Sequence, residues 1–263
     1  MDFLIYPGWV FYLFIFLMGL ALGSFLNSWI WRTRENIRIS RGRSMCPHCR
    51  RQLTWYENIP VFSYVFLFGR CRTCKKSIPW HFTFVEAGTA LIFTFVAWFH
   101  VNSANFVPAN FLRDIIFVAL LIVIFVFDAL YEVILPGVVW FGAIAGFVFN
   151  YFFLHYSLQS LLIGAVFACG FFLLQYVVSK GAWIGGGDVR MGFMMGIWLG
   201  WPVVLIALGI AYIGGSIISL GLVALKKQRF SSTTPFGTYL ALGTFAAMFW
   251  GQAIVNWYLG FLK

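Results

Sequence analysis

Residues 112–131 read LRDIIFVALLIVIFVFDALY, and this stretch decides the fold class. Residues 115–127 are apolar without interruption. A helix rises about 1.5 Å per residue, so roughly 20 such residues match the roughly 30 Å hydrocarbon core of a bilayer. The stretch therefore predicts a membrane-spanning helix, and Asp128 stands near its end.

Similar apolar runs fill most of the remaining chain. They cover residues 9–31, 82–100, 137–155, 158–178, 189–201, 202–224 and 237–259. Residues 189–224 are nearly continuous, and only Gly200, Trp201 and Pro202 mark a turn there. The chain is 62% hydrophobic and 10% charged, whereas soluble domains carry about 25% charged residues. This composition excludes a water-soluble fold and predicts an all-α integral membrane protein with about eight transmembrane helices.

The net charge of +10 raises the question of an acidic partner. Of the 18 Lys and Arg residues, 11 lie between Arg32 and Lys76, directly after the first apolar run. Such clustering beside a membrane helix is typical of a loop retained in the cytoplasm, and it is favoured over the alternative, nucleic-acid binding. We therefore expect no nucleic-acid partner, and we expect this basic loop to face anionic lipid headgroups.

The other loops orient the chain. Residues 101–110 contain no Lys or Arg and should face outside, and 131–136 should return to the cytoplasm, as should the loops that contain Lys180 and Lys226, Lys227 and Arg229. The first run lacks the basic n-region and the cleavage site of a removable signal peptide, so we interpret it as a retained helix. The pattern predicts a multi-pass protein with both termini outside.

Three segments follow from this reading. Residues 1–31 form the first transmembrane helix, 32–81 a cytoplasmic basic insert, and 82–263 a transmembrane helical bundle. The insert carries two Cys-x-x-Cys pairs, whose members are Cys46, Cys49, Cys71 and Cys74. Two such pairs can offer four thiolates to one Zn²⁺, and disulfides, the alternative, are disfavoured in the reducing cytoplasm. Four protein ligands leave no open position, so the expected zinc is structural and not catalytic.

Two of the eight acidic residues lie directly at the ends of apolar runs. Asp128 ends an apolar run, and Asp188 follows Gly185-Gly186-Gly187 and starts another. Carboxylates at membrane depth are costly and usually functional or paired. The alternatives are purely structural roles: an interfacial charge for Asp128 and a helix N-cap for Asp188. The predicted topology nevertheless places both near the same cytoplasmic face.

Such a carboxylate pair predicts a specific chemistry. Two carboxylates held close together share a proton, so one can activate water while the other polarises a peptide carbonyl. The glycine run 185–187 lacks Cβ atoms and can approach a substrate strand closely. The sequence contains no Gly-x-Ser-x-Gly, His-Glu-x-x-His or phosphate-binding Gly-x-x-x-x-Gly-Lys motif. Aspartyl peptidase chemistry is therefore the leading hypothesis.

The sequence resembles the bacterial prepilin leader peptidases over most of its length. The matching motifs are Gly23-Ser24-Phe25-Leu26-Asn27, Arg43 to Cys49, Gly69 to Cys74, Glu86, Asp128 before Ile134-Leu135-Pro136, Gly185-Gly186-Gly187-Asp188, and Pro235-Phe236-Gly237. The resemblance has departures: Asp128 lies eight residues before the proline where seven is usual, Arg190 replaces a lysine, and Thr238 stands where proline is frequent. The approach to Glu86, residues 80–85, also differs.

The resemblance implies an enzyme of the bacterial inner membrane. Such enzymes cleave the leader of type IV prepilins and pseudopilins after a glycine, at the cytoplasmic face, and use two catalytic aspartates that correspond to Asp128 and Asp188. Members with the cysteine insert usually also methylate the new N-terminus with S-adenosylmethionine, for which Glu86 is the candidate cofactor-binding residue. Two alternatives stay open: a peptidase without methyltransferase activity, and a non-enzymatic membrane module that recruits a partner through its zinc ribbon.

Overall fold

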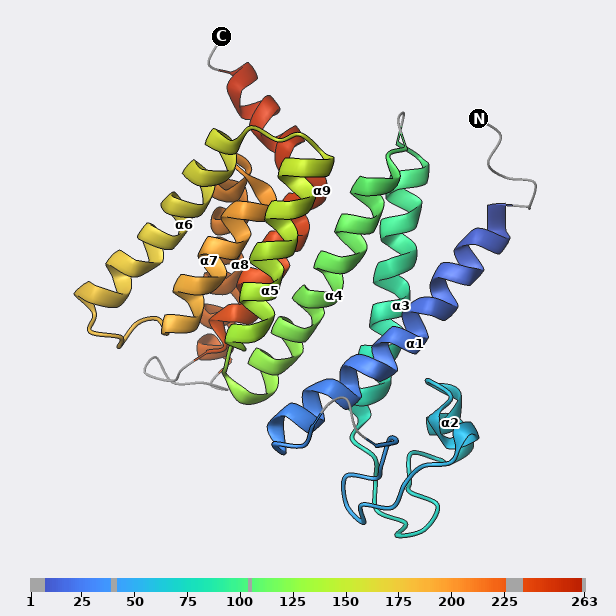
Figure 1. The fold of residues 1–263 in the computed structure, drawn as a ribbon. Helices are drawn as coiled ribbons and strands as arrows, with labels where there is room; N and C mark the ends of the chain where they lie inside the picture. The colour runs from blue at the N-terminus through green and yellow to red at the C-terminus, as the bar shows by residue number, and fades with distance from the viewer. Residues whose placement is uncertain (1–7, 39–41, 104–105, 226–233, 262–263) are drawn as a thin grey trace. The chain divides into compact units, whose positions relative to one another are not determined.

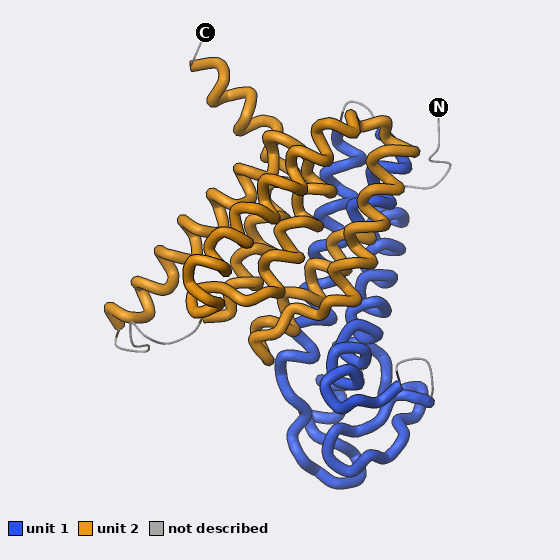
Figure 2. Tube along the Cα trace, turned by 60° about the vertical axis from the view of Figure 1, so that its left-hand side comes forward, with its two compact units in different colours: residues 1–115 blue, residues 116–263 orange. Residues whose placement is uncertain are grey.

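The computed structural model describes residues 8–38, 42–103, 106–225 and 234–261. Their contacts group the chain into two compact units, residues 1–115 and 116–263 (Figure 2). The predicted basic loop at Lys226, Lys227 and Arg229 lies outside the described residues.

Unit 1 contains two long helices joined by the cysteine-rich insert (Figure 1). Its elements are α1 (Gly8–Arg34), η1 (Trp55–Asn58), α2 (Phe62–Phe66) and α3 (Trp80–Val101), and α4 (Pro108–Tyr131) begins in it. The backbones of α1 and α3 approach closely at two glycines. A Cβ on Gly19 would lie 2.6 Å from Ala90 Cα, and one on Gly23 would lie 2.8 Å from Glu86 Cα. Small residues four apart are typical of close helix contacts in membranes.

Unit 2 is a helical bundle. Beyond α4 it consists of α5 (Pro136–Phe147), the π-helix η2 (Val148–Phe153), α6 (Leu158–Val178), α7 (Gly186–Leu199), α8 (Val203–Ala224) and α9 (Phe236–Gly260). Helices α6 and α7 pack antiparallel, because Ser160 near the start of α6 hydrogen-bonds Trp201 just after α7. Further along the pair, Gly196 lies directly against the backbone of Gly164.

Seven helices among the described residues are long and apolar enough to cross a membrane: α1, α3, α4, α5 with η2, α6, α8 and α9. The part of the chain that the structure describes contains no β-strand, only two isolated bridges. The predicted all-α multi-pass membrane protein is thereby confirmed. The remaining predicted run, 189–201, corresponds to α7, whose 14 residues extend only about 21 Å. This helix is too short to cross a bilayer alone.

The end of α7 lies among other helices, where its free carbonyl groups need donors. Asn150, which is fully buried on η2, supplies them: its Nδ2 donates to the carbonyls of Ile197 at 2.7 Å and Trp198 at 3.0 Å. The Trp198 indole donates to Gly142 O at 2.6 Å and stacks on Phe117. A π-helical turn and two buried polar side chains thus compensate for the shortness of α7.

Candidate functional site

Asp188 lies in the first turn of α7 and is 7% exposed. Its Oδ2 accepts the backbone N–H of Gly185 at 3.0 Å. The capping role considered from the sequence is therefore real, but Asp188 performs it from the third helical position, and Gly185 occupies the N-cap. A negative charge in this turn also faces the positive end of the helix dipole. Local sequence alone thus fixes the orientation of this carboxyl.

Asp128 lies three residues before the end of α4 and is 4% exposed. Its Oδ2 accepts the backbone N–H of Thr238 at 2.8 Å, in the first turn of α9. The carboxyl packs so closely on α9 that a Cβ on Gly237 would lie 2.9 Å from Asp128 Cγ. This partner lies 110 residues away in the chain, so tertiary packing, not local sequence, positions Asp128.

The side chain of Ile134 lies against both of the helix starts that carry or bind the two carboxyls. Ile134 is buried, and a Cβ on Gly187 would lie 3.0 Å from its Cβ, while a Cβ on Gly237 would lie 2.9 Å from its Cδ1. The isoleucine therefore fits between the starts of α7 and α9, where only glycines leave room. Glu132, just after α4, has a φ of 54°. The loop after Asp128 thus contains a left-handed residue, and the eight-residue spacing to Pro136 does not turn Asp128 away from Asp188.

Both carboxyls open into one cavity of about 860 Å³ within unit 2. Its walls also include Glu132, Gln175, Gly185, Gly187, Arg190, Tyr212, Ser216, Ser219, Phe236 and Tyr239. Asp188 lies outside the seven spanning helices. Burial raises the pKa of its carboxyl to about 6, and the negative charge of Asp128 contributes to the rise. A buried carboxyl pair that feels each other's charge can hold one proton between them, the protonation state that general acid–base hydrolysis requires.

Sequence reasoning missed three polar residues of this cavity. Tyr212 on α8 donates its hydroxyl to Gln175 Oε1 on α6 at 2.9 Å, and Glu132 lies close enough to Asp128 for its charge to act on it. Tyr212 and Gln175 interrupt apolar runs, and polar residues in membrane helices usually face a bundle interior or a cavity. That signal could have identified both of them.

The four insert cysteines form a second cluster, in unit 1. Their sulfur atoms all lie within 4.8 Å of one another, and the pairs Cys46–Cys74 and Cys49–Cys71 are each 4.0 Å apart. Tetrahedral zinc with Zn–S bonds of about 2.3 Å needs sulfur atoms a little under about 4 Å apart, so the cluster fits a metal ion.

The two Cys-x-x-Cys turns have the same backbone design. Cys46 N donates to Arg51 O and Cys71 N donates to Lys76 O, both at 2.9 Å. The residue after each pair, Arg50 or Lys75, has a φ of 58°. Backbone N–H groups within each turn also donate to the sulfur of its first cysteine. Such donors favour thiolates, the form that binds metal.

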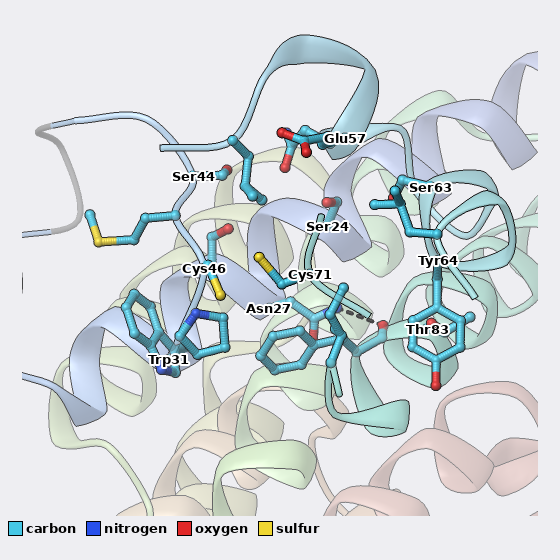
Figure 3. Close-up of a pocket in the computed structure, with 18 of the residues that line it drawn as sticks. Ser24, Asn27, Trp31, Ser44, Cys46, Glu57, Ser63, Tyr64, Cys71 and Thr83 are labelled. Carbon is cyan, nitrogen blue, oxygen red and sulfur yellow. Dashed lines mark hydrogen bonds between the residues drawn. The ribbon is translucent and has the colours of Figure 1, made fainter. Parts of the chain in front are cut away.

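A cavity of about 110 Å³ adjoins this cluster (Figure 3). Figure 3 shows its wall: Ser24 and Asn27 of α1, Ser63 and Tyr64 of α2, and Cys46 and Cys71 of the insert. Glu86 also lines it, and its Oε2 accepts the backbone N–H of Val61 at 2.7 Å. A neighbouring cavity of about 320 Å³ shares the wall residues Ser24, Ser28, Arg32, Ser44 and Asn58.

Comparison with known proteins covers both units. The family model of the bacterial peptidase A24 N-terminal domain matches residues 17–100, and that of the type IV leader peptidase family matches residues 115–220. A prepilin leader peptidase/N-methyltransferase of Legionella pneumophila is 30% identical over 97% of this chain and 96% of its own. A protein of the same name from Pseudomonas aeruginosa is 30% identical over 99% of this chain and 98% of its own. One from Aeromonas hydrophila is 31% identical over 95% of this chain and 94% of its own. No solved structure matches the chain.

Proposed function

The chain belongs to the type IV leader peptidase family, and we propose that it is a membrane-embedded aspartyl endopeptidase that cleaves the leader of type IV prepilins or pseudopilins after a glycine. The observation that carries the proposal is the placement of two buried carboxyls, from α4 and α7, in one cavity. Their separate anchors, Thr238 N–H and Gly185 N–H, hold them in place before substrate arrives. Such preorganisation is what acid–base catalysis requires.

The two environments assign different roles to the aspartates. Both carboxyls accept a backbone N–H, but burial and the charge of Asp128 raise the pKa of Asp188 to about 6. We therefore assign the shared proton to Asp188, and we assign Asp128 as the general base that takes a proton from the attacking water. Asp188 holds the proton and gives it to the carbonyl oxygen as the C–O bond forms. In the second step Asp128 returns its proton to the amide nitrogen, the C–N bond breaks, and Asp188 takes back the hydroxyl proton. The Gly185–Gly187 segment borders the same cavity and can accept an extended substrate.

The insert would hold a structural zinc ion on Cys46, Cys49, Cys71 and Cys74. Its role would be to fix two short turns that contain almost no regular secondary structure. No position would be left for a reacting water.

We propose N-methylation as the second activity. S-adenosylmethionine, when bound, supplies the methyl group for the new N-terminal amine. The larger of the two adjoining cavities, about 320 Å³, falls within the range of small-molecule sites, which begins at about 300 Å³. Glu86 lines the smaller cavity, and its carboxylate could bind the ammonium group of either reactant. A peptidase that lacks this second activity is the alternative.

The proposed location is the bacterial inner membrane, with both termini outside and the peptidase cavity at the cytoplasmic face. The basic insert supports this orientation, because Lys- and Arg-rich loops stay in the cytoplasm.

Co-expression with a candidate prepilin tests the proposal. We expect the intact chain to convert the prepilin to a shorter product, and Asp128→Asn and Asp188→Asn each to leave it uncut while inserting normally. Glu35→Gln is the matched control, because Glu35 is an exposed carboxylate paired with Arg50 in the insert. Normal cleavage by either aspartate variant would remove the dyad assignment. If the intact chain cuts no prepilin, the non-enzymatic module is favoured, and an unmethylated product would favour the peptidase-only alternative.

A further inference from the structure

The insert exposes an unusual number of large apolar side chains around α2. We call this surface the α2 face; it consists of Trp55, Phe62, Val65, Phe66 and Phe68. Phe66 is 76% exposed and Phe68 is 88% exposed. Several large apolar side chains exposed so close together in sequence are uncommon on parts of proteins that contact water only, and large exposed apolar surfaces mark sites that bind a partner or a membrane.

Helix α2 has two different sides. Phe62, Val65 and Phe66 follow the i, i+3, i+4 spacing and point outward. Ser63 and Tyr64, which lie between Phe62 and Val65, line the smaller cavity (Figure 3). Glu86 lines the same cavity. The two sides of α2 therefore differ: one is half-buried and faces a cavity inside unit 1, and the other is exposed.

A hydrogen bond made by the residue before α2 ties the start of this helix to the spanning helix α3. Val61, immediately before α2, donates its N–H to Glu86 Oε2 at 2.7 Å. Glu86 lies six residues after Trp80, where α3 starts, which corresponds to about 9 Å along the helix axis. Gly23 of α1 packs against the same glutamate, and it lies 11 residues before Arg34, the end of α1. The chain thus leaves α1 at Arg34 and returns beside both spans.

Charge at the edge of the α2 face fits one kind of partner. Arg70, Arg72, Lys75 and Lys76 follow the face directly in sequence. Arg72 hydrogen-bonds the Tyr56 hydroxyl beside Trp55, and its guanidinium lies 5.9 Å from the Tyr56 ring centroid. Apolar and aromatic side chains bordered by cations are the pattern of elements that lie in a bilayer interface with anionic lipid.

We propose that the α2 face is buried in the interface of the leaflet that adjoins the insert, with Phe62, Val65 and Phe66 among the upper acyl chains. The basic side chains then contact lipid phosphates. In this arrangement the insert is anchored to the bilayer by its own short helix as well as by α1 and α3. The cavity that contains Glu86 consequently has a membrane-anchored wall, formed by Ser63 and Tyr64.

Site-specific photocrosslinking of the full-length protein tests this inference. The photoreactive residue p-benzoylphenylalanine replaces Phe66, and the protein is reconstituted in vesicles of phosphatidylethanolamine and phosphatidylglycerol. Phe84, 68% exposed on the spanning helix α3, is the lipid-facing reference position. Gln52, exposed on the first Cys-x-x-Cys turn, is the water-facing reference position.

We expect lipid adducts at position 66 as often as at position 84, and roughly tenfold more often than at position 52. The factor follows because the transfer equilibrium of one Phe side chain between water and an apolar phase favours the apolar phase by at least about tenfold. An adduct yield at 66 equal to that at 52 would overturn the inference, as would a crosslink from 66 to a second copy of the chain. Reconstitution in phosphatidylcholine alone should lower the yield at 66 and leave that at 84 unchanged. The readout does not depend on catalysis, so it stands apart from the test of the peptidase dyad.

Discussion

Gly237→Ala should impair catalysis by displacing the Asp128 carboxyl, although it replaces no titratable residue. Gly237 lies in the first turn of α9, beside the amide that binds the Asp128 carboxyl. A Cβ added there would lie 2.9 Å from Asp128 Cγ, Asp128 Oδ2 and Ile134 Cδ1. The isoleucine atom is the end of a flexible side chain and can move aside. The carboxyl is held at 2.8 Å by Thr238 N–H and must move against that hydrogen bond.

The structure also gives the size of the effect. Ordinary contacts begin at 3.4 Å, so the carboxyl has to shift by about half an ångström to accept the new methyl group. A 1 Å misplacement of a catalytic group can cost about 100-fold in rate, so a shift of half that size should cost roughly tenfold in kcat. The cavity keeps its other walls, so KM for a prepilin should change much less than kcat.

The assay is cleavage of a purified prepilin by the reconstituted protein, with kcat and KM measured separately. Gly260→Ala is the control, because it makes the same change on the same helix with no atom within 4 Å of the new Cβ. A Gly237→Ala variant with unchanged kcat would refute the assignment of Asp128 to the reacting site. Adding Ile134→Val separates the two contacts: recovery of kcat would show that crowding of Ile134, and not the carboxyl shift, caused the loss.

Two further predictions concern packing and protonation. Gly196→Ala should lower the stability of unit 2 by about 1–3 kcal/mol, because its Cβ would collide with the backbone of Gly164. Gly170→Ala is the control, because a Cβ there would meet open space and should leave the stability unchanged. Thermal denaturation in detergent measures both variants, and equal midpoints would contradict the α6–α7 contact. Because burial and then the charge of Asp128 raise the pKa of Asp188 to about 6, the pair loses its shared proton above that value. The kcat should therefore fall as pH rises through about 6, and a kcat that rises through this range would contradict the role of Asp188 as proton donor.

The sequence predicted the parts of this protein that depend on composition and short spacing. Hydrophobic runs predicted the spanning helices to within a few residues, because the bilayer thickness alone sets their length. Paired Cys-x-x-Cys motifs predicted a four-sulfur cluster, since each turn brings two thiols together locally. The start of α7 at the glycine run was predictable too, because glycine and a following aspartate form a helix cap.

Other features depend on contacts between distant segments and could not be predicted. Residues 189–201 are largely apolar, and contacts from distant segments, above all the buried Asn150 on η2, explain how a 14-residue helix can end inside the bundle. The amide that binds Asp128 comes from α9, and no local pattern specifies which backbone N–H will meet a carboxyl. The α2 face lies in a segment that the sequence predicts only as a cytoplasmic loop, because five helical residues are too few to give a hydrophobic period.

The starts of two helices explain how two carboxyls can be kept buried in a bundle of spanning helices. Asp188 lies in the first turn of α7, and Asp128 meets the first turn of α9, so each faces backbone N–H groups that have no partner within their helix. The positive end of each helix dipole offsets part of the cost of burying a negative charge. Ile134 then sets the distance between the two helix starts, and the glycines at 187 and 237 are the space it needs. The position of the two carboxyls in the bundle is thus fixed by where α7 and α9 begin, which is why a short α7 with a glycine run before it is part of the site and not a defect of the bundle.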